Sequence, residues 1–221
     1  MRKVRGSLFV SLDGVMQAPG GPSEDPTGGF AHGGWVAGVF DEAVGAAIGE
    51  VFAGEYDLLL GRRTYDIFAA HWPHAEGEDA PMGEAFTAAN KYVLTRGGAD
   101  LGWANSHALT DMDAVAELKR GDGPDLVIQG SGTLYPQLLA AGLLDRLTLF
   151  TFPIVLGRGK RWFGDETLPG MLRMTNHVVT PGGAVVATYE PAGDVPVGDF
   201  AIAPRSEREL ARQRRMQDGS W

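Results

Sequence analysis

Two glycine-containing turns in the sequence carry the residue types that bind phosphate groups. Gly61-Arg62-Arg63-Thr64 follows an apolar run at residues 58–60, and Gly130-Ser131-Gly132-Thr133 follows one at residues 126–128. Each turn leads into a segment with helical character, and the first turn of a helix presents unpaired backbone N–H groups to an anion. Glycine lets the backbone approach a ligand, and arginine adds charge-assisted hydrogen bonds. The turns predict a phosphate site, although each alone is also typical of a structural turn with a capping hydroxyl.

Three further segments place polar groups at strand ends. Thr95-Arg96 follows a predicted strand and suits an anion such as a ribose 2′-phosphate. Ser11-Leu12-Asp13-Gly14 ends the first predicted strand, where a carboxylate can anchor a substrate hydroxyl or relay a proton. Residues 157–161 hold two glycines and three cations, which suit a substrate phosphate or a loop beside a cofactor. The structural alternatives, an Asp-Gly turn and solvated charges, stay open for each segment.

Other chemistries lack their signatures. The turn at residues 130–135 has no third glycine of the dinucleotide fingerprint and no Gly-Lys-Ser/Thr of a Walker loop. Ser131 lacks the Gly-x-Ser-x-Gly context of a serine hydrolase. The five histidines have no metal-ligand spacing, and the absence of cysteine excludes disulfides and thiolate zinc sites. We therefore predict no metal site.

Charge and length restrict the class of protein. The chain has 221 residues, of which 44% are hydrophobic, and a formal net charge of -9, which argues against binding nucleic acid. No apolar run is long enough for a membrane span, so no membrane partner is predicted. The basic start leads directly into an apolar strand, and we interpret it as the mature end of a cytoplasmic protein. Residues 205–221 carry +2, whereas residues 1–204 carry -11.

Strands and helices alternate along most of the chain. The apolar patterns predict strands at residues 4–12, 56–60, 91–95, 125–129 and 146–155, and a terminal hairpin at 172–180 and 184–189. Predicted helices lie at 41–52, from 64 to about 72, at 81–89, at 110–120 and from about 133 to 141. This order predicts a three-layer α/β/α fold with a mixed, mostly parallel sheet and an antiparallel C-terminal edge. Residues 1–190 form one predicted domain, and residues 191–221 form a Pro/Gly-rich linker and a charged tail that includes a helix at 205–217.

The order of the motifs resembles the dihydrofolate reductase-like superfamily. Ser11-Leu-Asp-Gly14, Gly61-Arg-Arg-Thr-Tyr65, Tyr92-Val-Leu-Thr-Arg96, Gly130-Ser-Gly-Thr-Leu134 and Pro153-Ile-Val-Leu-Gly-Arg-Gly159 succeed one another along the chain. The closer resemblance is to the reductase domain of the bifunctional riboflavin-biosynthesis deaminase–reductase, over about residues 2–190. A deaminase domain is absent from this length, and a chain without cysteine cannot build its zinc site.

The resemblance implies an NADPH-dependent reductase that acts on a small heterocyclic or sugar-type substrate, similar to 5-amino-6-(5-phosphoribosylamino)uracil, and forms a homodimer. By position it implies cofactor contacts from Gly61, Arg62, Thr64, Thr95, Arg96, Ile128, Gln129, Gly130, Ser131, Gly132, Thr133 and Leu134. Asp13 is the candidate catalytic residue, with water as the other proton source. The candidate substrate-binding residues are Ser11, Asp13, Trp35 and Asp41, with Trp35 and the 15–34 loop as a lid. The alternatives are a catalytically silent nucleotide-binding module of the same fold and a nucleotide transferase.

Overall fold

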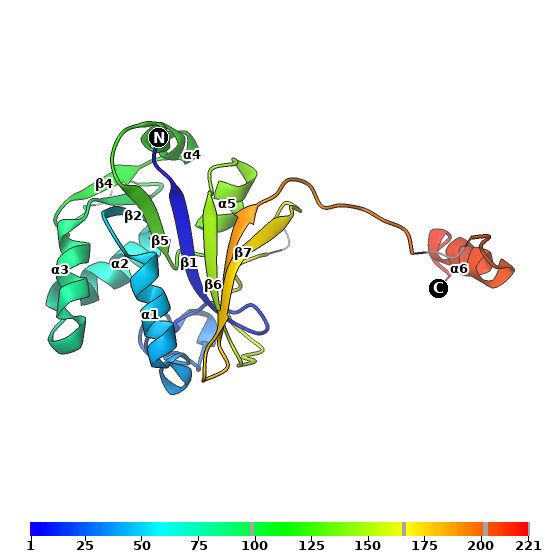
Figure 1. The fold of residues 1–221 in the computed structure, drawn as a ribbon, viewed down its shortest axis with the longest axis horizontal. Coiled ribbons are helices and arrows are strands. Elements are labelled where there is room, and N and C mark those ends of the chain that lie inside the picture. The colour runs from blue at the N-terminus through cyan, green and yellow to red at the C-terminus, as the bar shows by residue number, and fades with distance from the viewer. Residues whose placement is uncertain (98–99, 165–166, 201–202, 221) are drawn as a thin grey trace.

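In the computed structural model, which describes residues 1–97, 100–164, 167–200 and 203–220, the chain folds around one eight-stranded sheet (Figure 1). Its order is β4-β3-β2-β5-β1-β6-β8-β7. The strands are β1 (Val4–Ser11), β2 (Tyr56–Gly61), β3 (Lys91–Leu94), β4 (Ser106–Leu109), β5 (Asp125–Gln129), β6 (Arg146–Phe152), β7 (Leu172–Val179) and β8 (Val185–Pro191). The first six strands in this order, from β4 through β6, are parallel to one another. Strand β8 pairs with β6 in the antiparallel direction. The predicted fold class is confirmed.

Helices begin where the sequence offers a cap. The α-helices are α1 (Glu42–Val51), α2 (Arg62–His71), α3 (Ala80–Ala88), α4 (Met112–Arg120), α5 (Leu134–Ala140) and α6 (Glu207–Gln217). Short 3-10 turns lie at Thr27–Gly29, Ala37–Val39, Trp72–His74 and Gly77–Asp79. The carboxylates of Asp41 and Asp111 accept the N–H of Val44 and of Ala114, each at 2.9 Å, and so fix the starts of α1 and α4. At the end of α5, Gly142 has a φ of +63°, the conformation that a glycine adopts most easily after a helix.

Helices cover both faces of the sheet because alternate residues of the strands point to opposite sides. On one face, Leu59 and Leu126 pack with residues of α4 and α5. On the other face, Leu58 and Leu60 pack with Phe86 of α3, and Phe150 and Phe152 pack with Val44 of α1. The core therefore consists of apolar layers on both sides of the central strands.

A close approach of α5 to β1 fixes the centre of the fold. Tyr135 is fully buried, and its hydroxyl donates to the carbonyl of Ser7 at 2.9 Å. A Cβ atom at Gly6 would lie 2.3 Å from the Tyr135 ring, so this strand position requires glycine. This contact holds the helix that follows the second glycine turn against the central strand.

One missed strand and two shifted boundaries are the clearest differences from the sequence prediction. Strand β4 was not predicted, because its Ser-His-Ala-Leu sequence is short, half polar and exposed in its middle. Strand β6 ends at Phe152 rather than at residue 155, because Pro153 cannot donate a ladder hydrogen bond. Helix α2 begins at Arg62 rather than at Thr64, with Gly61 as its N-cap. The arginines of the first turn therefore belong to the helix itself.

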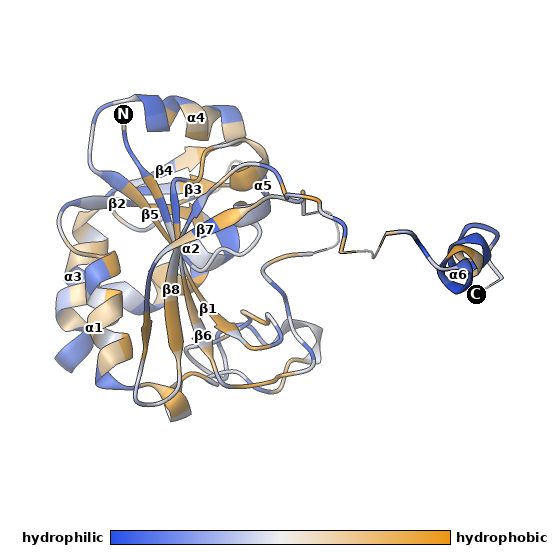
Figure 2. Cartoon of the chain, turned by 45° about the vertical axis from the view of Figure 1, so that its right-hand side comes forward, coloured by the Kyte–Doolittle hydropathy of each residue, from blue (hydrophilic) through white to orange (hydrophobic). Residues whose placement is uncertain are grey.

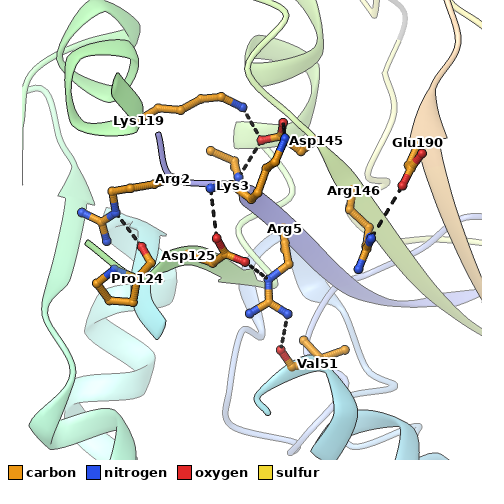
Figure 3. A network of polar contacts seen from close by, with 11 residues as sticks. Arg2, Lys3, Arg5, Val51, Lys119, Pro124, Asp125, Asp145, Arg146 and Glu190 are labelled. Atoms are coloured by element: carbon orange, nitrogen blue, oxygen red, sulfur yellow. Dashed lines mark hydrogen bonds and ion pairs between the residues drawn. The ribbon is translucent and has the colours of Figure 1, made fainter. Parts of the chain in front are cut away.

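Ion pairs close the amino-terminal edge of the sheet and involve the basic start of the chain (Figure 3). Arg2 is buried and pairs with Asp57, and its Nε donates to the Pro124 carbonyl at 2.6 Å. Arg5 pairs with Asp125 at 3.0 Å, and Lys3 pairs with Asp145 at 3.4 Å. The side-chain charges of Arg2, Lys3 and Arg5 are thus each paired with a carboxylate, and the Arg2 pair is buried whereas Lys3 stays mostly exposed.

Residues after β8 leave the body of the molecule. The segment from Ala192 runs outward and carries α6 at its end, as both views show (Figures 1 and 2). Of the predicted tail 191–221, residues 201–202 and 221 lie outside the described residues. Ser206 caps α6 by accepting the N–H of Glu209 at 3.2 Å. Over the described ranges, no helix has the length and apolarity to cross a membrane.

Candidate active site

The predicted site residues lie along one edge of the sheet. Strands β3, β2, β5, β1 and β6 are consecutive neighbours and parallel, so their carboxyl ends share that edge. The carboxyl ends of these strands and the turns after them contain Thr95, Gly61, Gly130, Asp13 and Pro153, in this spatial order. The carboxyl edge of an open parallel sheet is where such folds bind ligands. Five motifs that are distant in the sequence are therefore brought into one row.

Reciprocal hydrogen bonds join the two glycine turns. The N–H of Gly61 donates to Ser131 Oγ at 3.0 Å, and the N–H of Ser131 donates to Thr64 Oγ1 at 3.2 Å. Ser131 is buried, so these bonds form away from solvent. They fix the start of α2 against the start of α5, and both helices present their amino ends at the same edge. The pair of turns is a prebuilt cradle for an anionic group.

The second turn has an unusual backbone. Gly130 has a φ of +69° and Ser131 a φ of +54°, so two successive residues adopt the left-handed region. This conformation is costly for serine, and the two hydroxyl bonds to Gly61 and Thr64 hold it in place. Gly132 also packs closely, since a Cβ there would lie 2.6 Å from the sulfur of Met16.

The cradle leaves several backbone donors for a ligand. Among the hydrogen bonds of the described residues, none is donated by the N–H of Gly132 or of Thr133. The first N–H groups of α2, beginning at Arg62, also lack intrahelical acceptors because of helix geometry. Unpaired backbone donors of this kind can bind a phosphate group, and their contact with a cofactor stays a prediction.

The arginines near the cradle differ in whether their charge is paired. Arg62 pairs with Asp66 at 2.8 Å along α2, so its charge is partly compensated. Arg63 and Arg96 are exposed and have no side-chain hydrogen bond or ion pair within the described ranges. The N–H of Thr95 donates to the carbonyl of Leu109 at 3.0 Å, which continues the β3–β4 ladder and fixes the residue before Arg96. Among the described residues, Arg96 is thus an exposed cation without a side-chain partner, and it directly follows a residue that the β3–β4 ladder holds in place.

Three of the predicted cofactor residues are internal. The side chains of Ile128 and Leu134 are buried in the core, so only their backbones can face a ligand. The side chain of Gln129 accepts a hydrogen bond from Ser7. The side chains of these three residues thus have partners within the protein, and their contact with a cofactor stays a prediction.

Asp13 is held by the loop that follows β6. One carboxylate oxygen accepts from Ser11 Oγ at 2.7 Å and from the N–H of Leu156 at 3.0 Å, and the other accepts from the N–H of Gly157 at 2.9 Å. Hydrogen bonds from Ser11 and then from Leu156 lower the pKa of Asp13 to about 2. The group is therefore an ionised anchor near neutral pH, without a proton to donate.

The other predicted substrate residues also have internal partners. Trp35 is buried, packs on Phe152 and donates from Nε1 to the carbonyl of Gln17 at 2.8 Å. Asp41 caps α1 and accepts the N–H of Gly182 at 2.8 Å. Ser11 is buried and also accepts the N–H of Val15 at 2.9 Å. Their roles in substrate binding stay predictions.

A polar network that the sequence did not predict fixes the 15–34 loop. Gln17 donates to the carbonyls of Asp25 and Thr27, each at 2.9 Å, and accepts the N–H of Lys160 at 3.0 Å. The ammonium of Lys160 reaches Thr27 Oγ1 at 2.7 Å and pairs with Asp25. These bonds fix the loop to Lys160 in this structure, and its role as a substrate cover stays a prediction. Gln17 and Asp25 lie in a stretch without periodicity, and Asp25 and Lys160 are 135 positions apart, so the sequence pattern did not indicate that they pair.

Two other kinds of site were possible, a second hollow and a metal-binding cluster, and neither coincides with the cradle in the described residues. A hollow of about 660 Å³ beside α2 is lined by Tyr65, His74 and Trp103 and includes no residue of the second glycine turn. The described part of the chain contains no cluster of three or more His, Asp or Glu that suits a metal ion. The cradle at the carboxyl edge remains the candidate site.

Comparison with known proteins agrees with this architecture. The model of the RibD C-terminal domain matches residues 2–186. The uncharacterized protein YyaP of Bacillus subtilis is 26% identical over 199 residues, which cover 85% of this chain and 94% of that protein.

Solved structures show the same fold at low sequence identity. A putative riboflavin biosynthesis protein from Shewanella sp. PV-4 has a TM-score of 0.61 at 15% identity, and the match covers 86% of this chain and 99% of that one. A pyrimidine reductase-like protein from Corynebacterium diphtheriae has a TM-score of 0.55 at 14% identity, over 87% and 93%. Dihydrofolate reductase from Enterococcus faecalis, complexed with NADP(H) and RAB-propyl, has a TM-score of 0.52 at 14% identity, over 86% and 96%.

Proposed function

Because the chain belongs to the RibD C-terminal domain family, we propose that it is an NADPH-dependent reductase of a small heterocyclic or sugar-type substrate. The observation that carries the proposal is the pair of hydrogen bonds by which Ser131 joins the two glycine turns. This joint presents two helix starts as one phosphate cradle, and a dinucleotide needs such a cradle for its pyrophosphate. Arg96, at the end of the neighbouring strand, is the proposed contact of the 2′-phosphate.

The residues of the chain position the reactants. When bound, the reduced nicotinamide supplies a hydride to a C=N or C=O group. The Gly130–Thr133 turn fixes the pyrophosphate, and Asp13 fixes the loop at residues 156–157 on the substrate side. The pinned 15–34 loop excludes water from one side of the site. Rate enhancement by such a site comes mainly from holding the two reactants face to face.

We assign the proton to water rather than to Asp13. The carboxylate of Asp13 has a pKa of about 2 and accepts hydrogen bonds at both oxygens. Aspartate in this state cannot donate a proton near neutral pH. Asp13 is therefore a positioning residue in the proposed mechanism, through its hold on Leu156 and Gly157.

The substrate proposed first is the phosphoribosyl-aminouracil of riboflavin synthesis or a close analogue. The test measures NADPH oxidation by absorbance with this compound, with dihydrofolate and with a panel of small carbonyl compounds. Turnover with any of them supports a reductase, and preference for the aminouracil supports the narrower assignment. Tight NADPH binding without turnover across the panel would instead establish a silent binding module.

We further propose that the protein is a homodimer that uses the strands after residue 146. Seven of the eight residues of β7 are exposed, including Met174, Val178 and Val179. An exposed edge strand with apolar side chains is a surface that proteins cover by pairing. Sedimentation equilibrium tests this directly, and a monomer at all concentrations contradicts it.

A further inference from the structure

Met16, in the loop that follows β1, packs against the second glycine turn. Its sulfur would lie 2.6 Å from a Cβ atom at Gly132, and its Cε and Cγ atoms would lie 3.4 and 3.5 Å from the same point. The thioether is therefore directly beside the Cα atom of Gly132. The N–H groups of Gly132 and Thr133, which have no acceptor among the hydrogen bonds of the described residues, belong to the same turn. The proposed reductase mechanism gives Met16 no role.

The backbone on both sides of Met16 is fixed. The N–H of Met16 donates to the carbonyl of Lys160 at 2.9 Å, and the preceding residue, Val15, forms a β-bridge with Arg161. Val15 is fully buried and Gln17 is 3% exposed, so both sequence neighbours are held inside the fold. The side chain of Met16 can rotate, but its backbone cannot carry the sulfur away from the turn.

The sulfur of Met16 is open to oxidation. Met16 is only partly buried. The chain has seven methionines and no cysteine, so thioethers rather than thiols are the sulfur groups that a peroxide can oxidise. In this reaction a sulfur lone pair attacks one oxygen of hydrogen peroxide, and the O–O bond breaks. The hydroxide that leaves takes the proton of the transferred oxygen and becomes water. The sulfur is thereby oxidised to a sulfoxide, and the peroxide is reduced.

A sulfoxide at Met16 competes with a phosphate group for the same donors. Oxidation converts an apolar side chain into a polar one, whose oxygen accepts hydrogen bonds. This oxygen is one bond from the sulfur, beside the turn that carries the N–H groups of Gly132 and Thr133. We propose that Met16 is a modification site, and that its oxidation by a peroxide blocks the phosphate cradle. The inference rests on the proposed function, because it requires that the cradle binds the pyrophosphate of NADPH.

The other methionines separate oxidation at the turn from oxidation in general. Met174 is 51% exposed and lies on β7, the outermost strand of the sheet, so peroxide reaches it at least as easily as Met16. Met174→Leu is therefore the matched control for Met16→Leu. Each variant removes one sulfur and keeps an apolar side chain of similar volume.

The test treats the full-length wild type, Met16→Leu and Met174→Leu with hydrogen peroxide. Mass spectrometry follows the reaction at Met16, because the tryptic peptide of residues 6–62 contains no other methionine. Fluorescence titration with NADPH then compares each protein with its own untreated sample. We expect the Kd to rise about tenfold or more in wild type and in Met174→Leu, but by less than about twofold in Met16→Leu. Methionine sulfoxide reductases should restore the affinity of wild type, because they reverse this oxidation.

Two results of the titration overturn the proposal. An equal loss of NADPH affinity in treated Met16→Leu means that oxidation of another side chain is responsible. Unchanged affinity of a wild-type sample whose Met16 is fully oxidised means that the sulfoxide does not block the cradle.

Amide hydrogen exchange separates this proposal from the proposed function. If untreated wild type does not bind NADPH, the cofactor assignment is wrong, and the exchange rates of the Gly132 and Thr133 N–H groups decide the role of Met16. We expect oxidation to slow their exchange about tenfold or more in wild type, because these groups gain an acceptor, and to leave it unchanged in Met16→Leu. Equal exchange rates in the two treated proteins mean that the sulfoxide does not bind the turn, and they overturn the proposal.

Discussion

At the scale of single residues, Arg96 is the side chain whose removal best tests the cofactor assignment. It is exposed, follows a fixed strand end and has no internal partner in the described ranges. We expect Arg96→Gln to weaken NADPH binding about tenfold to a hundredfold, since a charged hydrogen bond contributes about 1.5–3 kcal/mol. NADH, which lacks the 2′-phosphate, should bind almost as before. Fluorescence titration with both cofactors measures the difference.

Arg120→Gln is the matched control for Arg96→Gln. Arg120 is also exposed, but it ends α4 just before β5 starts, at the opposite edge of the sheet. Its removal should leave both affinities unchanged. An equal loss of NADPH and NADH affinity in Arg96→Gln would contradict the 2′-phosphate role.

Asp13 gives a prediction about stability in acid. Its pKa is about 2 in the folded protein, below the ordinary value of 3.8, so the unfolded chain binds the proton first as the pH falls. The stabilisation is complete above about pH 4 and is lost progressively toward pH 2. We expect Asp13→Asn to lower the Tm at pH 6 and the difference from wild type to shrink between pH 4 and pH 2.5. Thermal unfolding across this range measures it, and a difference independent of pH contradicts the assignment.

At the scale of elements, the contact between α5 and β1 depends on a missing side chain. We expect Gly6→Ala to destabilise the fold by about 1–3 kcal/mol, because its Cβ would lie 2.3 Å from the buried Tyr135 ring. The same change at Gly49, within α1 and without atoms nearby, should stabilise by about 0.5–1 kcal/mol. Urea unfolding of both variants gives the free energies of unfolding. If both variants change the free energy of unfolding in the same direction, the close contact of Gly6 with Tyr135 does not determine the effect of the substitution.

The sequence predicted elements where one local signal was sufficient. Buried strands such as β5 are uninterrupted apolar runs, and Asp41, Asp111 and Gly142 mark helix ends by their own chemistry. Both glycine turns were predicted because glycine stands with Arg, Ser or Thr between an apolar run and a helical segment. Strand β4 was missed, since its four residues are stabilised by Lys91 to Leu94 of its neighbour rather than by their own pattern.

Long-range polar pairs explain what was missed in the site. The clamp of Asp13 on Leu156 and Gly157 joins residues more than 140 positions apart, and the hold of Lys160 on the 15–34 loop is similar. The hydrophobic pattern of neither segment indicates which distant residues it contacts. The left-handed backbone of Ser131 was hidden for the same reason, because Gly61 and Thr64 stabilise it from another turn.

At the scale of the whole molecule, positive charge is divided between the two edges of the sheet. Arg2, Lys3 and Arg5 are paired at the amino edge, whereas Arg63 in the first turn of α2 and Arg96 and Arg158 in loops are exposed near the carboxyl edge and make no side-chain ion pair in the described ranges. The proposed anionic cofactor would therefore meet a positive region on a chain whose net charge is -9. We expect the association rate of NADPH to fall as the ionic strength rises from about 0.01 to 0.15 M, because salt screens this local field. Stopped-flow fluorescence measures the rate, and a rise with salt would show that the net negative charge dominates.

The central position of β1 has a consequence for how the chain folds. Its neighbours in the sheet are β5 and β6, which begin at Asp125 and Arg146, so both partners of the first strand are synthesised more than 110 residues after it. During translation, β2, β3 and β4, which pair with one another in the folded protein, leave the ribosome before either partner of β1. Pairing of strands that are far apart in the sequence is slow, and unpaired strand edges favour aggregation. A nascent chain that stops before Phe152 therefore lacks the strand that completes the central ladder, and it is the form of this protein that most needs a chaperone.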